Sequence, residues 1–464
     1  MKKLLAMALA LVMALGVTTV AWAEENVAQT TKDGTTTPYT SLTDALNAAK
    51  GGGTVELLGD VTLTGTWTAV GTAADPFKGT FDGKGHTITG LNISTNENDY
   101  VGLIGMLDGG TVKNVKFASV SVSGKNDVGT AVGRIINGGT VSGVQVLGGT
   151  VSGAKRVGGV VGSIIADGSA LNCTNAATVT GSVYNVGGIV GAAYYTETGK
   201  QMYITNCANN GEVTSSGVGA GGIVGLSAAN VSGNTNTAAV KGTEVGGIVG
   251  EQKSYGSVTN NTNSGAVTYT SGENTYGAGG IIGWLRYHGT SEASAYEVSD
   301  IISVTGNKNS GSVTGGNNAG GIVGTVYNSA VIMNNKNTAT SFSAATFAAG
   351  IVGNYQTVET PAAEAPALNK LTFGSDNTST TPLEQITAEC KDLLIYTNGN
   401  AIEIVEVPDP TPETPPRYYY NSTTTTKDTG KTSSPKTFDA GMGIYALTAV
   451  LSVTGMAYVG KKKF

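Results

Sequence analysis

The sequence predicts an all-β protein that folds as a parallel β-helix, a solenoid with three short strands per coil and about nine or ten coils. Three observations lead to this prediction. Gly, Thr, Ser, Asn and Val dominate the composition, with 69 Gly in 464 residues and only 13% charged residues. A short glycine-rich motif recurs along the chain, and two aligned polar columns recur with it. Low charge with many β-branched residues favours strands over soluble helices.

The glycine-rich motif has the form VGGIVG or AGGIVG. Glycine pairs mark bends that need positive φ or a close approach of two backbones. The Ile or its equivalent is expected to point inward. One copy is too short to bury a core, so the copies are expected to stack as structural scaffold. They lie at Val157–Gly162, Val186–Gly191, Ala220–Gly225, Val245–Gly250, Ala278–Gly283 and Ala319–Gly324.

A column of Asn residues keeps a fixed place upstream of the motif in six successive repeats. Its steps along the chain are 34, 27, 27, 46 and 28 residues, which gives a base period near 27. Amide side chains that stack at a bend can pass hydrogen bonds from coil to coil. The sequence therefore predicts a structural ladder made of Asn175, Asn209, Asn236, Asn263, Asn309 and Asn337.

A second column lies two residues before the first and begins with Cys173 and Cys207, followed by Asn in the later repeats. Neighbouring coils are about 4.8 Å apart, a separation that a disulfide tolerates. Two interpretations are open, a disulfide across the coils or two stacked buried thiols. With Cys390 the chain has three Cys, and an odd number does not indicate a disulfide framework.

The start of the chain predicts export. Residues 1–23 have two lysines, then an apolar run, then the small-residue end Ala21-Trp22-Ala23, which is the pattern of a secretory signal peptide. An N-terminal membrane anchor is the alternative. The β-helix is expected over residues 24–357, with a capping helix at 41–50. Leu42, Ala45, Leu46 and Ala49 share one face of that helix, and Ser41 is its expected N-cap.

Three further segments follow the repeats. Residues 358–407 are expected to form a C-terminal cap region, with a closing helix in PLEQITAEC and a hairpin-like pair in TNGNAIEIVEV. Residues 408–433 are rich in Pro and Thr and predict an extended stalk. In the last segment, 434–464, SPKTF precedes an apolar stretch at 442–460 and a tail of three lysines. This stretch is long enough for one transmembrane helix.

The last segment resembles the cell-wall sorting signal of Gram-positive surface proteins. Pro435 and Thr437 match the family's LPxTG-like pentapeptide, whereas Ser434 and Phe438 replace its usual Leu and Gly. The resemblance implies that a sortase cleaves between Thr437 and Phe438 and joins the chain to peptidoglycan. A plain C-terminal membrane anchor is the alternative. Either outcome places the body of the protein on the cell surface.

The repeats resemble a second family. VGGIVG, together with FDGKGHTITGL at 81–91 and GGTVKNVKF at 109–117, is similar to the GLUG-motif repeat of bacterial surface proteins. The wider region, about 40–355, looks like the pectate-lyase-type β-helix superfamily, which implies a right-handed solenoid. Repeats of this kind occur in both adhesins and enzymes.

No pattern in the sequence indicates catalysis or a cofactor. The chain has two His and no HExxH, and the glycine motif lacks the Asp that calcium-binding repeats require. The net charge of −6 argues against a nucleic-acid partner. We therefore predict no catalytic residues, no metal site and no cofactor.

Ligand binding is expected where the period breaks. The longest step, 46 residues, coincides largely with Trp284–Asp300, which carries Trp284, Arg286, Tyr287, His288 and Tyr296. A smaller insertion, Tyr194–Tyr203, carries Tyr194 and Tyr195. Insertions in solenoids loop out from one edge, and aromatic side chains with Arg suit recognition. The alternative is that these aromatics pack on an apolar side of the rod.

Three functions are consistent with these patterns. The first is an adhesin or structural surface protein that binds a glycan or a protein through the two insertions. The second is a polysaccharide lyase or glycoside hydrolase on the same scaffold. The third is a passive spacer without a ligand.

Overall fold

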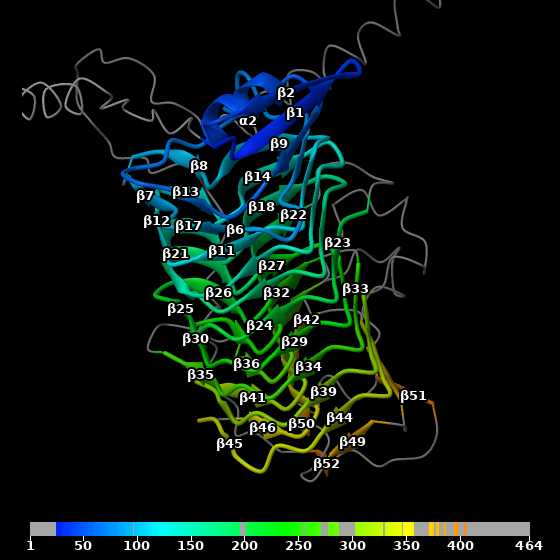
Figure 1. Ribbon diagram of the computed structural model, residues 1–464. Coiled ribbons are helices and arrows are strands. Elements are labelled where there is room, and N and C mark those ends of the chain that lie inside the picture. Colours follow the sequence, from blue (N-terminus) through cyan, green and yellow to red (C-terminus); the bar gives the residue numbers. More distant parts are fainter. Residues whose placement is uncertain are drawn as a thin grey trace, which may run out of the picture. The chain divides into compact units, whose positions relative to one another are not determined.

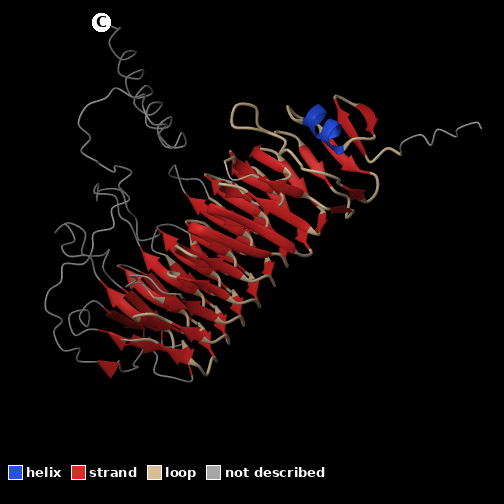
Figure 2. Cartoon of the chain, turned by 90° about the vertical axis from the view of Figure 1, so that its left-hand side faces the viewer, coloured by secondary structure: helices blue, strands red, loops and turns tan. Residues whose placement is uncertain are grey.

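The computed structural model describes residues 25–356, apart from 96, 195–200, 254–255, 271–276, 287–301, 328–329 and 346, and short pieces up to residue 404. The chain divides into two units, Met1–Val407 and Pro408–Phe464. The described part of the first unit is a parallel β-solenoid whose coils stack along one axis (Figures 1 and 2). This confirms the predicted all-β solenoid.

The first two sheets run the length of the solenoid. The first sheet has 14 strands in the order β2 (Thr35–Tyr39), β1 (Ala28–Lys32), β3 (Thr54–Leu57), β5 (Thr80–Asp82), β10 (Thr111–Lys113), β15 (Thr140–Ser142), β19 (Ser169–Leu171), β23 (Tyr203–Thr205), β28 (Asn230–Ser232), β33 (Ser257–Thr259), β38 (Ser303–Thr305), β43 (Ala330–Met333), β48 (Leu371–Gly374) and β51 (Leu394–Thr397). The second sheet has 11 strands, β4 (Val61–Thr62), β6 (Thr87–Thr89), β11 (Lys116–Ala118), β16 (Gln145–Val146), β20 (Thr174–Asn175), β24 (Ala208–Asn209), β29 (Thr235–Asn236), β34 (Thr262–Asn263), β39 (Lys308–Asn309), β44 (Lys336–Asn337) and β49 (Thr378–Ser379).

The other two sheets complete each coil. The third sheet has 16 strands, β7 (Asn92–Ser94), β8 (Asp99–Val101), β12 (Val120–Ser123), β13 (Asn126–Val128), β17 (Gly149–Gly158), β21 (Thr178–Gly187), β25 (Val213–Ser215), β26 (Val218–Gly221), β30 (Val240–Gly242), β31 (Val245–Gly246), β35 (Val267–Tyr269), β36 (Ala278–Gly279), β40 (Val313–Thr314), β41 (Asn318–Gly320), β45 (Phe342–Ser343) and β46 (Phe347–Ala349). The fourth sheet has nine strands, which agrees with about nine coils: β9 (Ile104–Asp108), β14 (Val132–Ile136), β18 (Val161–Ile165), β22 (Val190–Tyr194), β27 (Val224–Ser227), β32 (Val249–Lys253), β37 (Ile282–Arg286), β42 (Val323–Tyr327) and β47 (Val352–Gln356).

The prediction of three strands per coil was wrong, because each full coil crosses four sheets. The glycine motif is the reason. In the copy Val186–Gly191, Val186 and Gly187 end the third-sheet strand β21, and Val190 begins the fourth-sheet strand β22. Ile189 lies at the corner between the two strands and is fully buried, as expected. The motif is therefore a corner that joins two strands, not one strand preceded by a bend.

Two glycines of the motif are required by close approach. A Cβ on Gly188 would overlap the carbonyl oxygen of Gly222 and the side-chain amide of Asn209. A Cβ on Gly191 would overlap the backbone of Arg156 and Val157 in the preceding coil. Each fourth-sheet strand accordingly packs against a third-sheet strand of the coil before it, for example β22 on β17 and β27 on β21. The motif is scaffold, because its glycines allow these two sheets to pack at backbone distance.

The helix expected at 41–50 is present as α2 (Leu42–Ala49). The Ser41 Oγ accepts a hydrogen bond from the Asp44 backbone N–H at 3.3 Å, which satisfies one of the free donors at a helix start. Its four predicted apolar residues are all buried, and the helix contacts β1, β2 and β3. Figure 2 shows it beside one end of the stacked coils. Its role as a cap stays a prediction.

The C-terminal expectations differ from the structure where it describes them. PLEQITAEC contains a short strand, β50 (Gln385–Ile386), in place of the expected helix, and this strand pairs in parallel with β52 (Glu403–Ile404). β51 pairs with β48 and not with β52. The open edge of the first sheet gives β51 a parallel partner, so among the described residues of this segment β51 and β52 do not form the expected pair.

Several predicted segments lie outside the described residues. These are the signal peptide 1–23, the stalk 408–433, the apolar span 442–460 and the sorting residues Pro435, Thr437 and Phe438. Within the part of the chain that the structure describes, no helix has the length and apolar character needed to cross a membrane.

Candidate functional site

The predicted Asn column forms a continuous hydrogen-bonded chain inside the solenoid. The Nδ2 of each of the first five members donates to the Oδ1 of the Asn in the next coil, at 2.9–3.0 Å, and that of Asn337 donates to the Ser379 Oγ at 3.3 Å. Each of the first five amides also donates to a backbone carbonyl two residues later, as Asn209 does to Gly211 at 2.8 Å. Every member is at most 1% exposed. The column is interior scaffold and is not accessible to a ligand.

The second column forms another ladder, parallel to the first. The sequence analysis aligned its residues but did not describe them as a hydrogen-bonded ladder. Its Asn side chains donate from coil to coil at 3.0–3.1 Å, and the ladder extends to Asn377 beyond the last aligned repeat. Cys173 and Cys207 begin it as free, buried thiols. The Cys173 N–H donates to the Cys207 Sγ at 3.4 Å, and the Cys207 N–H to the Asn234 Oδ1 at 2.8 Å. A side-chain hydrogen bond with Cys173, together with burial, raises the pKa of the Cys207 thiol well above its usual value, although the backbone N–H of Cys173 acts in the opposite direction.

Two of the expected ligand-binding residues are buried, which corrects the prediction that they lie on an exposed loop. Trp284 and Arg286 belong to strand β37, pair in register with Glu251 and Lys253 of β32, and are 7% and 9% exposed. The Arg286 guanidinium lies 4.0 Å from the centroid of the Trp284 ring and forms an ion pair with Glu251. Trp284 also meets Tyr327 edge to face. These two side chains therefore pack against the solenoid, which was the alternative to an exposed loop.

The other predicted ligand-binding residues are only partly described. Tyr194 is the last residue of β22 and is half-buried. Burial and the charge of Asp127 raise the pKa of its phenol. Tyr195, Tyr287, His288 and Tyr296 lie outside the described residues. Their part in binding stays a proposal.

Most of the extra residues of the longer repeats enter at one corner of the solenoid, and residues 271–276, between the third-sheet strands β35 and β36, are the exception. Residues 195–200 follow β22 and precede β23, and residues 287–301 follow β37 and precede β38. Residues 254–255, 328–329 and 357–370 likewise fall between a fourth-sheet strand and the next first-sheet strand. Tyr203, at the start of β23 on this corner, is 41% exposed. We call this edge the insertion corner.

A buried acidic pair lies near the insertion corner. Glu244 and Glu251 are 5% and 2% exposed. Arg286 pairs with Glu251, and the Lys253 ammonium lies 3.9 Å from the same carboxylate. Burial, together with the charge of Glu251, raises the pKa of Glu244 to about 8 despite the nearby Arg286 and Lys253. Glu244 is therefore mostly protonated at neutral pH.

We expect the variant Glu244→Gln to be more stable than the wild type at pH 9. Burial favours the protonated carboxyl group of Glu244 in the folded state. The stability that this form contributes is fully present below the unfolded pKa, near 4.5, and is lost as the pH rises through the folded pKa of about 8. Within this window the wild type loses at most about 1.4 kcal/mol per pH unit relative to the variant. Thermal melts at pH 4 to 9 measure the difference. Exposed Glu212→Gln is the control, and equal pH dependence in both variants would contradict the assignment.

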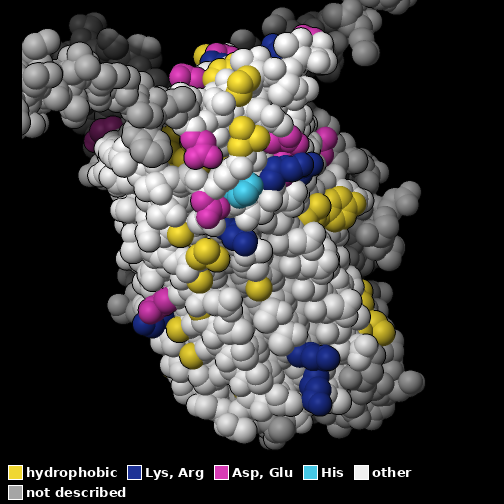
Figure 3. All heavy atoms as spheres, viewed as in Figure 1, with side chains coloured by type: hydrophobic (Ala, Val, Ile, Leu, Met, Phe, Trp, Pro, Cys, Tyr) yellow, Lys and Arg dark blue, Asp and Glu magenta, His cyan; other side chains and the backbone are white. Residues whose placement is uncertain are grey.

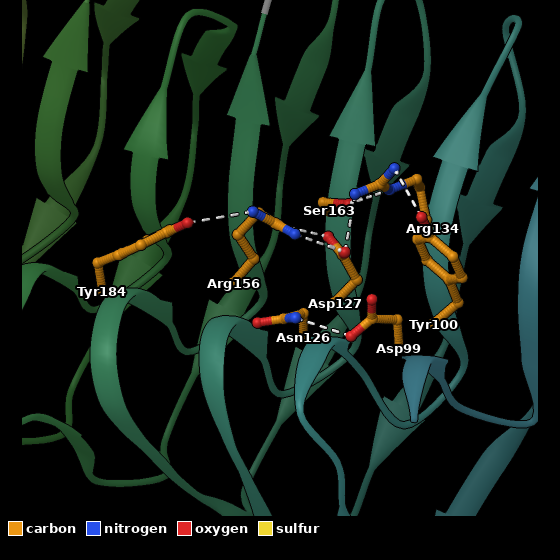
Figure 4. Close-up of polar contacts among 8 residues, drawn as sticks. All are labelled: Asp99, Tyr100, Asn126, Asp127, Arg134, Arg156, Ser163 and Tyr184. Atoms are coloured by element: carbon orange, nitrogen blue, oxygen red, sulfur yellow. Dashed lines mark hydrogen bonds and ion pairs between the residues drawn. The ribbon is translucent and has the colours of Figure 1, made fainter. Parts of the chain in front are cut away.

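A second buried charged network joins four successive coils (Figure 4). Asp127 is fully buried and accepts hydrogen bonds from the Arg156 Nε at 2.7 Å and the Arg134 Nη2 at 2.8 Å. Both arginines are 6% exposed. Tyrosine hydroxyls lie at the two ends, with Arg134 donating to Tyr100 and Arg156 to Tyr184. Two guanidinium groups thus share one carboxylate, so the described side chains of this network carry a net charge of +1.

A shallow groove of about 430 Å³ crosses the bend of the third sheet next to this network. Its floor is glycine backbone, since a Cβ on Gly153 would meet the side chains of Val128 and Val157. Hydroxyl side chains line it in successive coils. These are Ser123, Ser152, Thr180, Ser182 and Ser216, with Lys125 at one end. The groove is a built concavity with polar walls, and none of its residues was selected from the sequence.

The described residues show no metal-binding group, since no three His, Cys, Asp or Glu side chains among them are placed to hold an ion. His86 lies at the surface, where its Nδ1 is 3.5 Å from an Asp60 carboxylate oxygen. Figure 3 shows that charged side chains on one face gather over the first coils, whereas the later coils present mainly uncharged polar surface. The accessible chemistry of that face is dominated by hydroxyl and amide groups.

Comparison with known proteins gives limited similarity. No protein-family model matches the chain. A stretch of 60 residues is 43% identical to part of halomucin from Haloquadratum walsbyi, which covers 13% of this chain and 1% of halomucin. Among solved structures, the crystal structure of a candidate immunoglobulin A1 protease from Bacteroides ovatus aligns over 67% of this chain and 79% of that chain, with 20% identity and a TM-score of 0.34. This chain therefore spans a very small part of halomucin.

Proposed function

We propose that the protein is a surface-displayed binding module, an adhesin or structural surface protein that presents ligand-binding segments from a rigid solenoid. The insertion corner is the observation that carries this proposal. Three separate repeats place extra residues at this one edge, 195–200, 287–301 and 357–370, and the edge includes the exposed Tyr203. In solenoids, insertions on one face commonly form the binding surface.

We infer the location on the cell surface from the segments predicted at the two ends of the chain. The signal peptide, the stalk and the sorting-like segment together support attachment to a Gram-positive wall by a sortase, or to the membrane if no sortase acts. Halomucin, which shares a short stretch with this chain, supports an extracellular setting only weakly, because so little of it is matched.

The competing proposal is a polysaccharide lyase or glycoside hydrolase. Glu244 and Glu251 are the observation that favours it, because a carboxyl group with a raised pKa beside a second carboxylate suits acid–base catalysis. Both side chains are at most 5% exposed, and Arg286 is bound to Glu251. A glycan has no access to carboxylates buried in this way, so binding without catalysis is the better-supported function.

Arrays of glycans and matrix proteins, probed with the purified full chain, test the proposal. We expect binding that the double variant Tyr287→Ala/Tyr296→Ala reduces at least about tenfold, since aromatic anchors each contribute 1–2 kcal/mol or more. Tyr287→Phe/Tyr296→Phe keeps the rings and is the matched control. Absence of any binding would favour the passive spacer. Release of shortened glycans with unsaturated or new reducing ends would show an enzyme instead.

A further inference from the structure

The groove on the third sheet has a regular arrangement that suits an extended polymer. Strand register places Ser123, Ser152 and Thr180 side by side on β12, β17 and β21. Parallel neighbours are about 4.8 Å apart, so the groove offers one hydroxyl per coil in a line along the solenoid axis. A chain of sugar units lying along this axis would meet a repeated donor and acceptor at each coil.

The charges beside the groove favour an anion. Lys125 lines one end, and the Lys155 ammonium lies 5.1 Å from the centroid of the half-buried Tyr184 ring. The Tyr184 hydroxyl in turn accepts a hydrogen bond from Arg156, whose partner Asp127 is shared with Arg134 (Figure 4). The net positive charge of the described side chains of this network lies in a buried region, where solvent screens it weakly. It therefore adds to the attraction of the two lysines.

Two acidic side chains of the described residues, Asp99 and Glu97, lie toward one end of the groove. Asp99 accepts a hydrogen bond from Asn126 at 2.7 Å, and the exposed Glu97 precedes it in the chain. Both lie on the N-terminal side of Lys125, whose N–H donates to the Asn98 carbonyl. The coils of Lys155 and Tyr184 are therefore the place where a negative group is best accommodated.

We propose that this groove binds an acidic polysaccharide, a glycan chain that carries carboxylate or sulfate groups. The hydroxyl row contacts the sugar units, Tyr184 provides ring surface at the edge, and Lys155 and Lys125 bind the acidic groups. This inference rests on the proposed binding function and names the class of ligand. It places a second binding surface away from the insertion corner.

Binding of the purified full chain, immobilised on a sensor, to hyaluronan, chondroitin sulfate and neutral dextran of similar length tests the proposal. We expect binding to the acidic polymers and not to dextran, and weaker binding as salt increases. The double variant Lys125→Gln/Lys155→Gln should lose roughly tenfold or more in affinity, which corresponds to about 1.4 kcal/mol. The ratio of the affinities for hyaluronan and chondroitin sulfate shows whether carboxylate or sulfate is preferred.

Lys308→Gln/Lys336→Gln is the matched control. It removes the same charge from two exposed residues of the second sheet, far along the chain from the groove. Equal loss in both double variants would overturn the groove assignment and leave only a general charge effect. Equal binding of dextran would overturn the acidic class. Binding of other array ligands without any acidic polysaccharide would refute this inference while leaving the proposed function intact.

Discussion

Replacement of Asp127 by Asn is expected to lower the free energy of unfolding by about 3–5 kcal/mol, the cost of breaking a buried ion pair. The carboxylate is fully buried and holds two arginines that are 6% exposed. Without it both guanidinium groups remain charged in a site that excludes water. Urea unfolding measures the loss, and hydrogen exchange in β13, β14 and β17 locates it, because solenoids can lose structure coil by coil.

Asp99→Asn is the control for this prediction. Asp99 is exposed and accepts one hydrogen bond from Asn126, so we expect a change within about 0.5 kcal/mol. Equal effects of the two substitutions would show that the Asp127 network contributes no special stability.

The same network predicts a dependence on acid. Burial alone would raise the pKa of Asp127, but the hydrogen bond from Arg156 and the charge of Arg134 outweigh it and hold the pKa below its usual value. The contribution of Asp127 to stability is therefore present above the unfolded pKa, about 3.9, and is lost as the pH falls through the lower folded value. Below pH 4 the stability of Asp127→Asn should change less with pH than that of the wild type.

Replacement of Asn236 by Ala is expected to cost about 3 kcal/mol, from lost buried hydrogen bonds and a small cavity. Asn236 accepts from Asn209 at 2.9 Å and donates to Asn263 at 2.9 Å and to the Ala238 carbonyl at 2.9 Å. The substitution interrupts the ladder in its middle. Thermal unfolding measures the loss, and hydrogen exchange should increase most in β24, β29 and β34.

Asn210→Ala is the matched control for the ladder. Asn210 is exposed and accepts a single hydrogen bond from the Thr237 hydroxyl at 2.7 Å, so a change below about 1 kcal/mol is expected. If the two Asn→Ala variants unfold alike, the interior ladder does not stabilise the fold in the way its geometry indicates.

The repeats made the architecture predictable from the sequence. A stacked strand has its own copy as its neighbour, so an aligned column such as the one containing Asn209 and Asn236 reports a spatial contact directly. The number of sheets was missed because Val186 and Val190 are both inward-facing residues of the motif, and their spacing does not show that a corner separates them. Helix α2 was predictable because its apolar spacing and its Ser41 cap are local signals.

The candidate sites were less predictable. Trp284 and Arg286 were assigned to the insertion because the extra residues of the longest repeat were counted from Trp284 onward. An alignment of WLR with EQK and TVY of the neighbouring repeats would have continued the strand to Arg286. The charged network was missed because its members come from separate repeats. A usable signal existed, since Asp127 and Arg156 each stand directly before a Val-Gly pair of the repeated motif. Glu244 of the acidic pair has the same position in its own repeat.

The two Asn ladders have a direction, because in each pair of neighbouring Asn one side-chain N–H donates to the Asn of the next coil toward the C-terminus, and no amide donates to the Asn of the coil before it. The other N–H donates to a backbone carbonyl of its own coil in the first ladder and of the preceding coil in the second. A completed coil therefore ends with N–H donors that only the following coil satisfies. A chain that leaves the cell N-terminus first would present these donors to each new repeat as it emerges. With the proposed export, the ladders would provide a one-way template for assembly, in which each finished coil favours the in-register addition of the next.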